Sequence, residues 1–339
     1  MTGRERIERL LAGAPADRPP FSPADYEHKA ALVGVSPSRL ARDPDLLEQA
    51  LAREAELYRP DLLTVGCDVY NVEAEAAGCE VRFPETNDVP AVVTRALGPG
   101  DEPRELRIPD PEKDGRMPVF LEAGRRVASR LGAALVVRGA LSAPFSIAAE
   151  LVGAEVLLLA LLDDPDWASR LLERTAAMAA AYGRAFHERG LGVILFDSHA
   201  APPLVPPRLY EKIVLPPTAS VIAHFRRELG IPLVPYIMGG DTAPLLDLIL
   251  ATGTNNVLCD FRADLSAFVT RLAGRPVLLR ANLDPRFLFA ASPEAIRSRT
   301  REVLAVGRRH PGFLLGTGIL PYDILPEKVL AVRDVLDEK

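Results

Sequence analysis

The chain has few cysteines, no long hydrophobic run and no excess of positive charge. Its three cysteines, Cys67, Cys79 and Cys259, are widely spaced and form no CxxC pair. They therefore do not build a disulfide framework, and they fit a reducing compartment. The longest apolar run, Val156 to Leu162, is too short to span a bilayer. With a net charge of −6, the chain also lacks the excess of basic residues that non-specific nucleic-acid binding requires.

Two further absences narrow the class of protein. The first residues, MTGRERIERLLAG, form a charged amphipathic pattern and lack the apolar core of a secretory signal peptide. No GxGxxG follows any strand-like run, which weakens a dinucleotide-binding interpretation. We therefore expect a cytoplasmic protein that acts on a small molecule and binds neither nucleic acid nor membrane.

The residues that are present favour one large α/β domain. Hydrophobic residues make up 48% of the 339 residues and charged residues 25%, enough for a large core under a well-solvated surface. From residue 61 onward, short apolar runs alternate with helical patterns. The runs expected to be strands are 61–66, 134–140, 192–197, 232–237, 256–260, 276–281 and 312–318. The helical patterns cover 145–162, 164–188, 210–229, 244–252, 265–273, 292–306 and 326–336.

This alternation is typical of a parallel sheet covered by helices on both faces, and the number of units favours a closed barrel. The segment 79–106 carries turn residues between alternating runs, so we expect a β excursion there. The first sixty residues show helical periodicity at 1–12 and 43–58, separated by a proline-rich connection. We predict a single (β/α)8 TIM-type barrel over residues 61–339, with residues 1–60 as an N-terminal helical extension of the same domain.

In such barrels, the active site is built at the C-terminal ends of the strands. We predict catalytic roles for four residues at these ends: Asp197, His199, Tyr236 and Asp241. The predicted substrate-binding residues are Asp68, Asn71, Glu73, Glu75, Arg138, Ser142, Met238, Asp260, Arg280, Asn282, Asp284, Thr317 and Tyr322. We expect Asp197, His199, Tyr236, Asp241 and Asn282 to converge on one pocket.

Structural alternatives stay open for several of these residues. Glu73 and Glu75 can cap a helix, and Asn282 and Asp284 can be turn formers before Pro285. Cys259 lies near a strand end, but a free cysteine is often only a small buried apolar side chain.

Four segments resemble the uroporphyrinogen decarboxylase and methylcobamide methyltransferase superfamily. RGALSAPFSIAAELVG at 138–153 is similar to its strand-to-helix turn, and NLDPRFL at 282–288 to its Asn-Leu-Asp-Pro signature. YNVEAEAAGCEV at 70–81 and GTGILPYDILPEKVLAV at 316–332 resemble the methyltransferase branch. The segments occur in the family order over residues 60–335. The resemblance implies a (β/α)8 barrel with its cleft at the C-terminal face.

The chain departs from both branches of the superfamily. The decarboxylases carry N-terminal arginines that grip substrate carboxylates, whereas this chain has no arginine between Arg18 and Arg39. The zinc-dependent methyltransferases carry His-x-Cys-Gly and a later Gly-Cys-Gly. The corresponding positions here hold Tyr236, Met238 and Thr317, which are poor zinc ligands. We therefore expect no zinc at this site and no efficient decarboxylation of uroporphyrinogen.

The leading hypothesis is a methyltransferase that acts with a separate corrinoid protein and holds no tightly bound cofactor of its own. A reduced corrinoid is already a strong nucleophile, so demethylation of a methoxy or methylamine donor needs only a hydrogen-bond donor for the leaving atom. His199, Tyr236 or Tyr322 could donate, and Asp197 or Asp241 could orient the donor. The alternatives are a decarboxylase of a smaller tetrapyrrole or other carboxylate, and a non-catalytic binding or regulatory relative.

Overall fold

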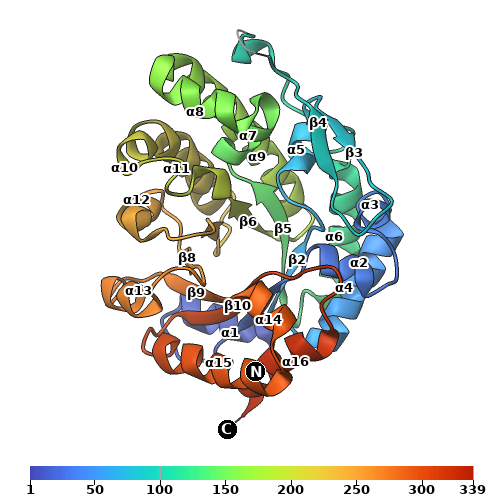
Figure 1. Cartoon of the computed structure of the whole chain (residues 1–339), viewed down its shortest axis with the longest axis vertical. Helices are drawn as coiled ribbons and strands as arrows, with labels where there is room; N and C mark the ends of the chain where they lie inside the picture. The colour runs from blue at the N-terminus through green and yellow to red at the C-terminus, as the bar shows by residue number, and fades with distance from the viewer. Residues whose placement is uncertain (99–100, 339) are drawn as a thin grey trace.

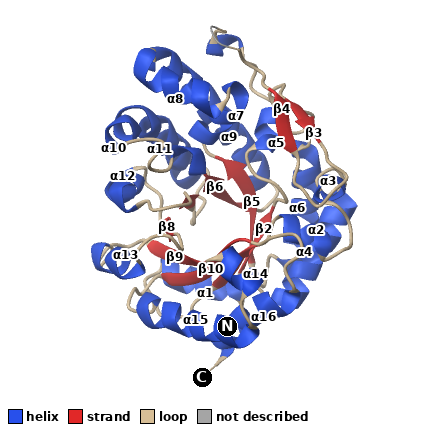
Figure 2. Ribbon diagram, in the orientation of Figure 1, coloured by secondary structure: helices blue, strands red, loops and turns tan. Residues whose placement is uncertain are grey.

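The computed structural model describes residues 1–98 and 101–338. Its centre is a ring of parallel strands surrounded by helices (Figures 1 and 2). In chain order, the strands of the ring are β1 (Phe21–Ala24), β2 (Leu62–Val65), β5 (Val136–Ser142), β6 (Gly192–Phe196), β7 (Tyr236–Ile237), β8 (Asn256–Cys259), β9 (Leu278–Leu283) and β10 (Phe313–Ile319). They form two four-stranded sheets, β1-β10-β9-β8 and β2-β5-β6-β7.

Backbone contacts join the two sheets at both edges. The Asp61 N–H donates to the Phe21 carbonyl at 2.8 Å, which places β2 beside β1. On the other side, an isolated parallel bridge between Pro235 and Asn256 links β7 to β8. The strands therefore follow one another around a (β/α)8 barrel, as the sequence predicts.

The helices that cover the ring begin where the sequence provides capping residues. Asp164 accepts a hydrogen bond from the Trp167 N–H at the start of α9 (Pro165–His187), and Pro165 occupies the first helical position. Asp43 and Ser292 cap two other helices in the same way. The remaining helices are α1 (Gly3–Leu11), α2 (Glu27–Ala31), α3 (Pro37–Leu40), α4 (Pro44–Tyr58), α5 (Asn71–Ala76), α6 (Met117–Leu131), α7 (Pro144–Val152), α8 (Ala154–Asp163), α10 (Pro207–Leu209), α11 (Leu215–Ala223), α12 (Leu246–Ala251), α13 (Leu265–Arg271), α14 (Pro285–Ala290), α15 (Pro293–Gly307) and α16 (Pro326–Asp337).

The N-terminal segment contributes more than helices. Residues 1–60 are predicted to be a helical extension outside the barrel. In the structure, β1 instead pairs in parallel with β10 and belongs to the wall of the barrel. Prolines surround and interrupt this short strand at Pro19, Pro20 and Pro23, and they hide its β pattern. The predicted strand at 232–237 is also shorter, because prolines 232 and 235 cannot donate ladder hydrogen bonds.

The expected β excursion is present as an antiparallel pair, β3 (Glu80–Arg82) and β4 (Ala91–Thr94), which lies outside the ring. The single helix expected at 145–162 is instead two helices, α7 and α8, which meet at 108°. Gly153 lies between them with a φ of +92°, a conformation that residues with a side chain rarely adopt. In the described part of the chain, no single helix is long and apolar enough to cross a membrane.

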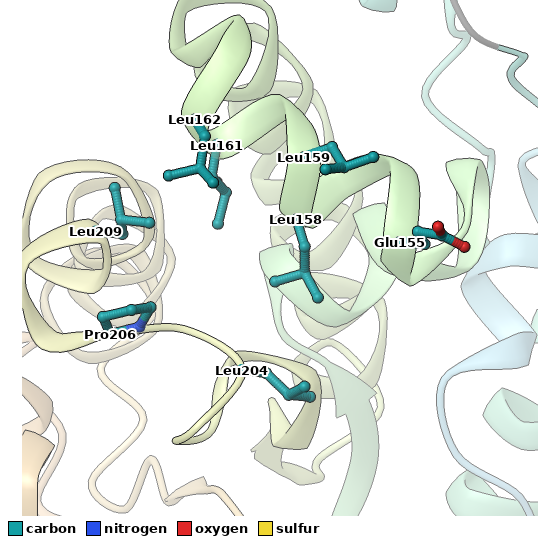
Figure 3. Close-up of a pocket in the computed structure, with 8 residues that line it drawn as sticks. All are labelled: Glu155, Leu158, Leu159, Leu161, Leu162, Leu204, Pro206 and Leu209. Atoms are coloured by element: carbon teal, nitrogen blue, oxygen red, sulfur yellow. The ribbon is translucent and has the colours of Figure 1, made fainter.

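Helix α8 extends from the exit side of β5 and presents leucines to the segment around α10 (Figure 3). Between them lies an apolar groove of about 450 Å³, lined mainly by Leu158, Leu161, Leu162, Leu204, Pro206 and Leu209. Leu162 and Leu204 are respectively 67% and 50% exposed. The groove therefore leaves apolar surface open to solvent.

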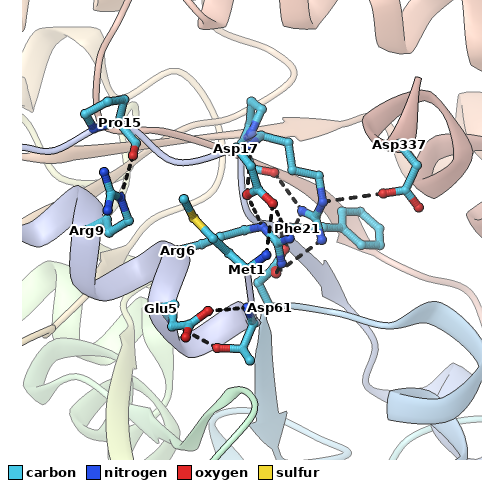
Figure 4. Close-up of polar contacts among 12 residues, drawn as sticks. Met1, Glu5, Arg6, Arg9, Pro15, Asp17, Phe21, Asp61 and Asp337 are labelled. Carbon is cyan, nitrogen blue, oxygen red and sulfur yellow. Dashed lines mark hydrogen bonds and ion pairs between the residues drawn. The ribbon is translucent and has the colours of Figure 1, made fainter. Parts of the chain in front are cut away.

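The opposite end of the barrel, where the strands begin, is closed by a buried ion-pair network (Figure 4). Arg6 of α1 donates to Asp61 at 2.9 Å, and Arg18 donates to the other carboxylate oxygen at 2.7 Å. The Phe21 N–H also donates to Asp61. Arg18 further approaches Asp337 of α16 at 3.5 Å. This network joins the first and last helices to the start of β2.

Candidate active site

An apolar wall lines the inside of the barrel towards the end where the strands finish, which we call the strand-exit face. Tyr26, Ile194, Phe196, Ile237 and Leu258 form one buried cluster there. The Tyr26 and Phe196 rings meet edge to face, with their centroids 5.8 Å apart. Because alternate residues of a strand face opposite sides, these positions face inward while their neighbours pack against the outer helices.

Two arginines reach into the same interior from the barrel strands. Arg138 of β5 donates to Thr64 Oγ1 at 3.1 Å and to Ser22 Oγ at 2.8 Å. Arg280 of β9 donates from Nε to Asn282 Oδ1 at 2.8 Å and from Nη2 to the Ser22 carbonyl at 3.0 Å. Burial lowers the pKa of Arg138 to about 9 and that of Arg280 to about 10.

A glycine makes room for one of these side chains. A Cβ atom added at Gly316 would lie 2.5 Å from Arg280 Nε and 2.6 Å from Asn282 Oδ1. Both distances are shorter than a non-bonded contact, so only glycine at this position of β10 lets the Arg280 guanidinium lie where it does.

On one side of the exit face, His199 lies among polar and aromatic side chains. Its Nε2 atom is 3.7 Å from the Glu150 carboxylate, which also pairs with Arg95 at 2.6 Å. The Tyr70 ring contacts the imidazole edge to face at 4.9 Å between centroids. The Nδ1 atom is enclosed and has no hydrogen-bond partner among the described residues. Burial lowers the pKa of His199, and Glu150 opposes this shift.

Tyr70 holds a backbone conformation that is unusual for a bulky residue. Its φ is +76°, and its hydroxyl accepts a hydrogen bond from the Ser198 N–H at 3.3 Å. Such outliers cost of order 1–3 kcal/mol and concentrate at functional sites. The conformation turns the chain between β2 and α5 so that Tyr70 reaches His199.

Across the exit face, Asp260 organises the turn after β7. Its two oxygens accept hydrogen bonds from the Gly240 N–H at 2.6 Å and the Phe261 N–H at 2.9 Å. A pocket of about 280 Å³ lies beside it, and Asn282 and Asp284 line this pocket as well. Asp284 caps α14, whereas Asp241 is exposed and caps the turn at Ala243.

Asp197 and Tyr236 lie on the outer side of the strands. The Tyr236 hydroxyl donates to Asp197 at 2.6 Å, and the other carboxylate oxygen accepts from the Ser146 N–H and hydroxyl, each at 2.8 Å. Burial raises the pKa of Asp197 to about 6, although these hydrogen bonds oppose the shift. The five side chains expected in one pocket are thus separated. Asp197 and Tyr236 lie together behind the wall, His199 is at Glu150, Asn282 is at Arg280 and Asp241 is on the surface.

The acidic residues after β2 form a second buried network, centred on Arg116. Its guanidinium donates to Asp68 at 2.9 Å, to Asn71 at 2.8 Å and to Glu75. Glu73 instead accepts from the Ser142 N–H at 2.7 Å and the Ser142 hydroxyl at 2.9 Å. Of these expected residues, four therefore hold α5 against the barrel: Asp68, Asn71, Glu73 and Glu75.

The positions that correspond to zinc ligands in the related methyltransferases do not fit that metal. Tyr236 is bonded to Asp197, and Met238 is buried in the core between strands and helices. Thr317 Oγ1 accepts a hydrogen bond from the Ala24 N–H at 3.0 Å. Nor does any group of three or more His, Cys, Asp or Glu residues, within the ranges described, lie close enough to hold a metal ion. Tyr322 donates its hydroxyl to the Val35 carbonyl.

Four residues of these networks are not predicted from the sequence: Tyr26, Tyr70, Arg116 and Glu150. Tyr26 follows the unrecognised strand β1, and Arg116 precedes the unpredicted helix α6, so neither has a strand-end signal. Glu150 lies inside a helix, where an acidic residue ordinarily faces solvent. Only Tyr70 had a signal, because it begins the acidic segment at 70–81.

Comparisons with known proteins agree with the barrel fold. A family model described as uroporphyrinogen decarboxylase (URO-D) matches residues 2–338. The methylcobamide:CoM methyltransferase MtbA of Methanosarcina acetivorans is 26% identical over 314 residues, which are 90% of this chain and 90% of that protein. A uroporphyrinogen decarboxylase of Burkholderia thailandensis is 30% identical over 323 residues, covering 91% of this chain and 82% of that protein. A solved methyltransferase from Methanosarcina mazei has a TM-score of 0.87 at 20% identity and covers 99% of this chain and 98% of that one.

Proposed function

The chain belongs to the uroporphyrinogen decarboxylase family, and on that premise we propose that it transfers a methyl group from a small methylated substrate to a corrinoid on a separate protein. The two relatives described above, a methyltransferase and a decarboxylase, are both named as enzymes. The similarity to a methylcobamide methyltransferase extends over nine-tenths of both chains, which supports methyl transfer.

The observation that carries the proposal is the pairing of His199 with Glu150, combined with the loss of the zinc ligands. Tyr70 connects His199 to the apolar wall of the barrel interior, which we call the lumen. Tyr236, Met238 and Thr317 cannot activate a thiol acceptor through zinc. His199 keeps a partly exposed side chain and a neighbouring carboxylate that stabilises its charged form. The site thus provides a proton donor without a thiol-activating metal.

A reduced corrinoid supplies a nucleophile strong enough to accept the methyl group. When the bond from the methyl carbon to oxygen or nitrogen breaks, the electron pair stays on the leaving atom, which then needs a proton. We assign that proton to His199; burial disfavours its imidazolium form, and Glu150 offsets part of that cost. Tyr70 holds the imidazole edge and restricts its rotation.

The exit face also offers a surface for the corrinoid protein. Apart from Met1, the exposed large hydrophobic side chains of the described chain all lie in segments that leave the C-terminal end of a barrel strand. They are Val89, Val93, Leu159, Leu162, Leu204, Phe289, Ile319 and Leu325. Contiguous exposed apolar surface marks protein interaction sites, and the groove that includes Leu159, Leu162 and Leu204 is such a surface. Since a bulky corrinoid must reach the barrel mouth, a corrinoid protein is the occupant that best explains apolar residues around that mouth.

The test is an anaerobic assay of purified protein with cob(I)alamin and a panel of methoxy and N-methyl compounds. Loss of cob(I)alamin absorbance and appearance of the methylated form would support the proposal. His199→Asn should slow turnover by about a hundredfold to ten-thousandfold. The control is His187→Gln at the end of α9, which should leave the rate unchanged. If no donor reacts, or if His199→Asn reacts at the full rate, methyl transfer through this site is refuted.

Decarboxylation of a small carboxylate is the second candidate, because Arg138 and Arg280 place two cations inside the barrel. Release of carbon dioxide from a carboxylate substrate, without any corrinoid, would favour this reaction.

A further inference from the structure

Arg138 and Arg280 are buried, and no carboxylate in residues 1–98 and 101–338 forms an ion pair with either of them. The structure describes three other buried arginines, and each of them pairs with a carboxylate. Arg6 pairs with Asp61, Arg116 with Asp68 and Arg333 with Asp337. Among the described residues, no carboxylate lies within ion-pairing distance of Arg138 or Arg280, which are 2% and 3% exposed; Glu54 and Asp260 act on them only from farther away. A buried charge without a counter-ion is strongly unfavourable, so this exception requires an explanation.

The two guanidinium groups lie side by side. Both donate to the same residue, Arg138 to the hydroxyl of Ser22 and Arg280 to its carbonyl. Their other acceptors, Thr64, Asn282 and the Thr317 carbonyl, are neutral as well. Two positive charges therefore share one small space and repel each other, which adds to the cost of burial.

Each guanidinium also keeps donor capacity that the chain does not use. The Nη1 atoms of Arg138 and Arg280 have no hydrogen-bond partner in residues 1–98 and 101–338, and neither atom is completely enclosed. The Tyr26 hydroxyl likewise has no partner in those ranges, and its ring belongs to the apolar wall above the arginines. Burial raises the pKa of Tyr26, and the charges of Arg138 and Arg280 oppose that shift, so the three groups are close enough to interact.

We propose that Arg138, Arg280 and Tyr26 bind the carboxylate of a small anionic substrate at the bottom of the lumen. The free donors, one Nη1 on each arginine and one phenol hydroxyl, match the two oxygens of a carboxylate. A phosphate has more oxygens and more charge than these donors satisfy. The apolar wall of Phe196, Ile237 and Leu258 would contact the uncharged part of the substrate.

This inference rests on the proposed function in one respect. If the substrate is a methyl donor, its carboxylate lies at the bottom and its methyl group points towards His199 and the barrel mouth. The donor is then a methylated small carboxylic acid. Binding of the carboxylate can be measured without methyl transfer, so the two proposals can fail separately.

The experiment is calorimetric titration and thermal melting of the full chain in phosphate-free buffer. The probes are propionate, succinate, inorganic phosphate and propanamide, which has the shape of propionate without its charge. We expect a carboxylate to bind and propanamide not to bind. Arg138→Met and Arg280→Met should each weaken carboxylate binding by about tenfold to a hundredfold, since a hydrogen bond to a charged group is lost. A variant with lysine at either position should bind carboxylate more weakly than the native chain but more tightly than the methionine variant. Lysine keeps the positive charge but loses the planar guanidinium that donates two parallel hydrogen bonds.

Arg286→Met, which removes an exposed arginine from the same face, is the matched control and should bind like the native chain. Without ligand, the Arg138→Met protein should melt at or above the native temperature, because an uncompensated charge has been removed. Failure of all probes to bind, binding of phosphate alone, or unchanged carboxylate affinity in both methionine variants would overturn the assignment. Carboxylate binding without methyl transfer from any donor would instead overturn the proposed function and leave this site in place.

Discussion

The substitution Arg116→Met is the most direct test of which contacts hold the segment after β2 in place at the exit face. The native guanidinium bonds to Asp68, Asn71 and Glu75, and it lies 4.9 Å from the Phe83 ring centroid. The Asp68 side chain is only 1% exposed. Glu75 is 21% exposed, so water screens its ion pair with Arg116 and that pair contributes less to stability.

Methionine keeps the apolar stem but leaves Asp68 with only the Cys67 thiol, 3.7 Å away. Removing one partner of a buried ion pair costs about 3–5 kcal/mol, and loss of the contact with Phe83 adds about 0.5–1 kcal/mol. Together these losses should lower the free energy of unfolding by about 3.5–6 kcal/mol, measured by urea denaturation with an unchanged slope.

Arg125→Met within α6, the helix that Arg116 precedes, is the control, because its pair with Glu122 is exposed and should contribute less than about 1 kcal/mol. Adding Asp68→Asn to Arg116→Met should restore part of the lost stability. A loss below about 1 kcal/mol for Arg116→Met would show that the network does not hold this segment.

Four further outcomes are expected. In the native protein, stability should decline as pH rises from about 4 to about 6, because the folded-state pKa of Asp197, about 6, lies above the unfolded value. Asp197→Asn should remove this decline, and unfolding curves across this range would check it. Gly153→Ala should cost about 1 kcal/mol in urea denaturation, since the φ of +92° strains alanine although no atom blocks its Cβ. Metal analysis of protein purified without chelator should find no stoichiometric zinc, and one zinc per chain that disappears on mutating Cys259 or His199 would contradict this. Incubation with uroporphyrinogen should yield no efficient production of coproporphyrinogen, because no arginine lies between Arg18 and Arg39.

The sequence predicts the barrel well because buried parallel strands and capped helices leave clear local patterns. Asp164 and Pro165 mark the start of α9 without any knowledge of the fold. The bend at Gly153 is harder to predict, because one apolar pattern runs through both α7 and α8. Strand β1 has no pattern of its own, and its pairing with β10 depends on residues almost three hundred positions away.

The site is less predictable, because it depends on which way each strand residue faces. A strand buried on both faces shows no alternation of polar and apolar residues, so its inward positions cannot be identified from the sequence. Tyr236 faces the helices and Arg138 faces the lumen, yet both are polar residues in apolar strands. A shift of one residue along a strand moves a side chain to the opposite face of the sheet. The ends of the strands can therefore be predicted from the sequence, whereas the side chains that share one pocket cannot.

The closed network at the strand starts has a consequence for engineering. Asp61, Arg6 and Arg18 fix the barrel at the end opposite the exposed apolar side chains of the exit face. If the exit face binds a partner protein as we propose, the contacts that stabilise the fold and the surface that selects the partner lie at different ends of the barrel. A library that randomises Leu159, Leu162 and Leu204 should yield chains with altered partner preference that still unfold at the native temperature.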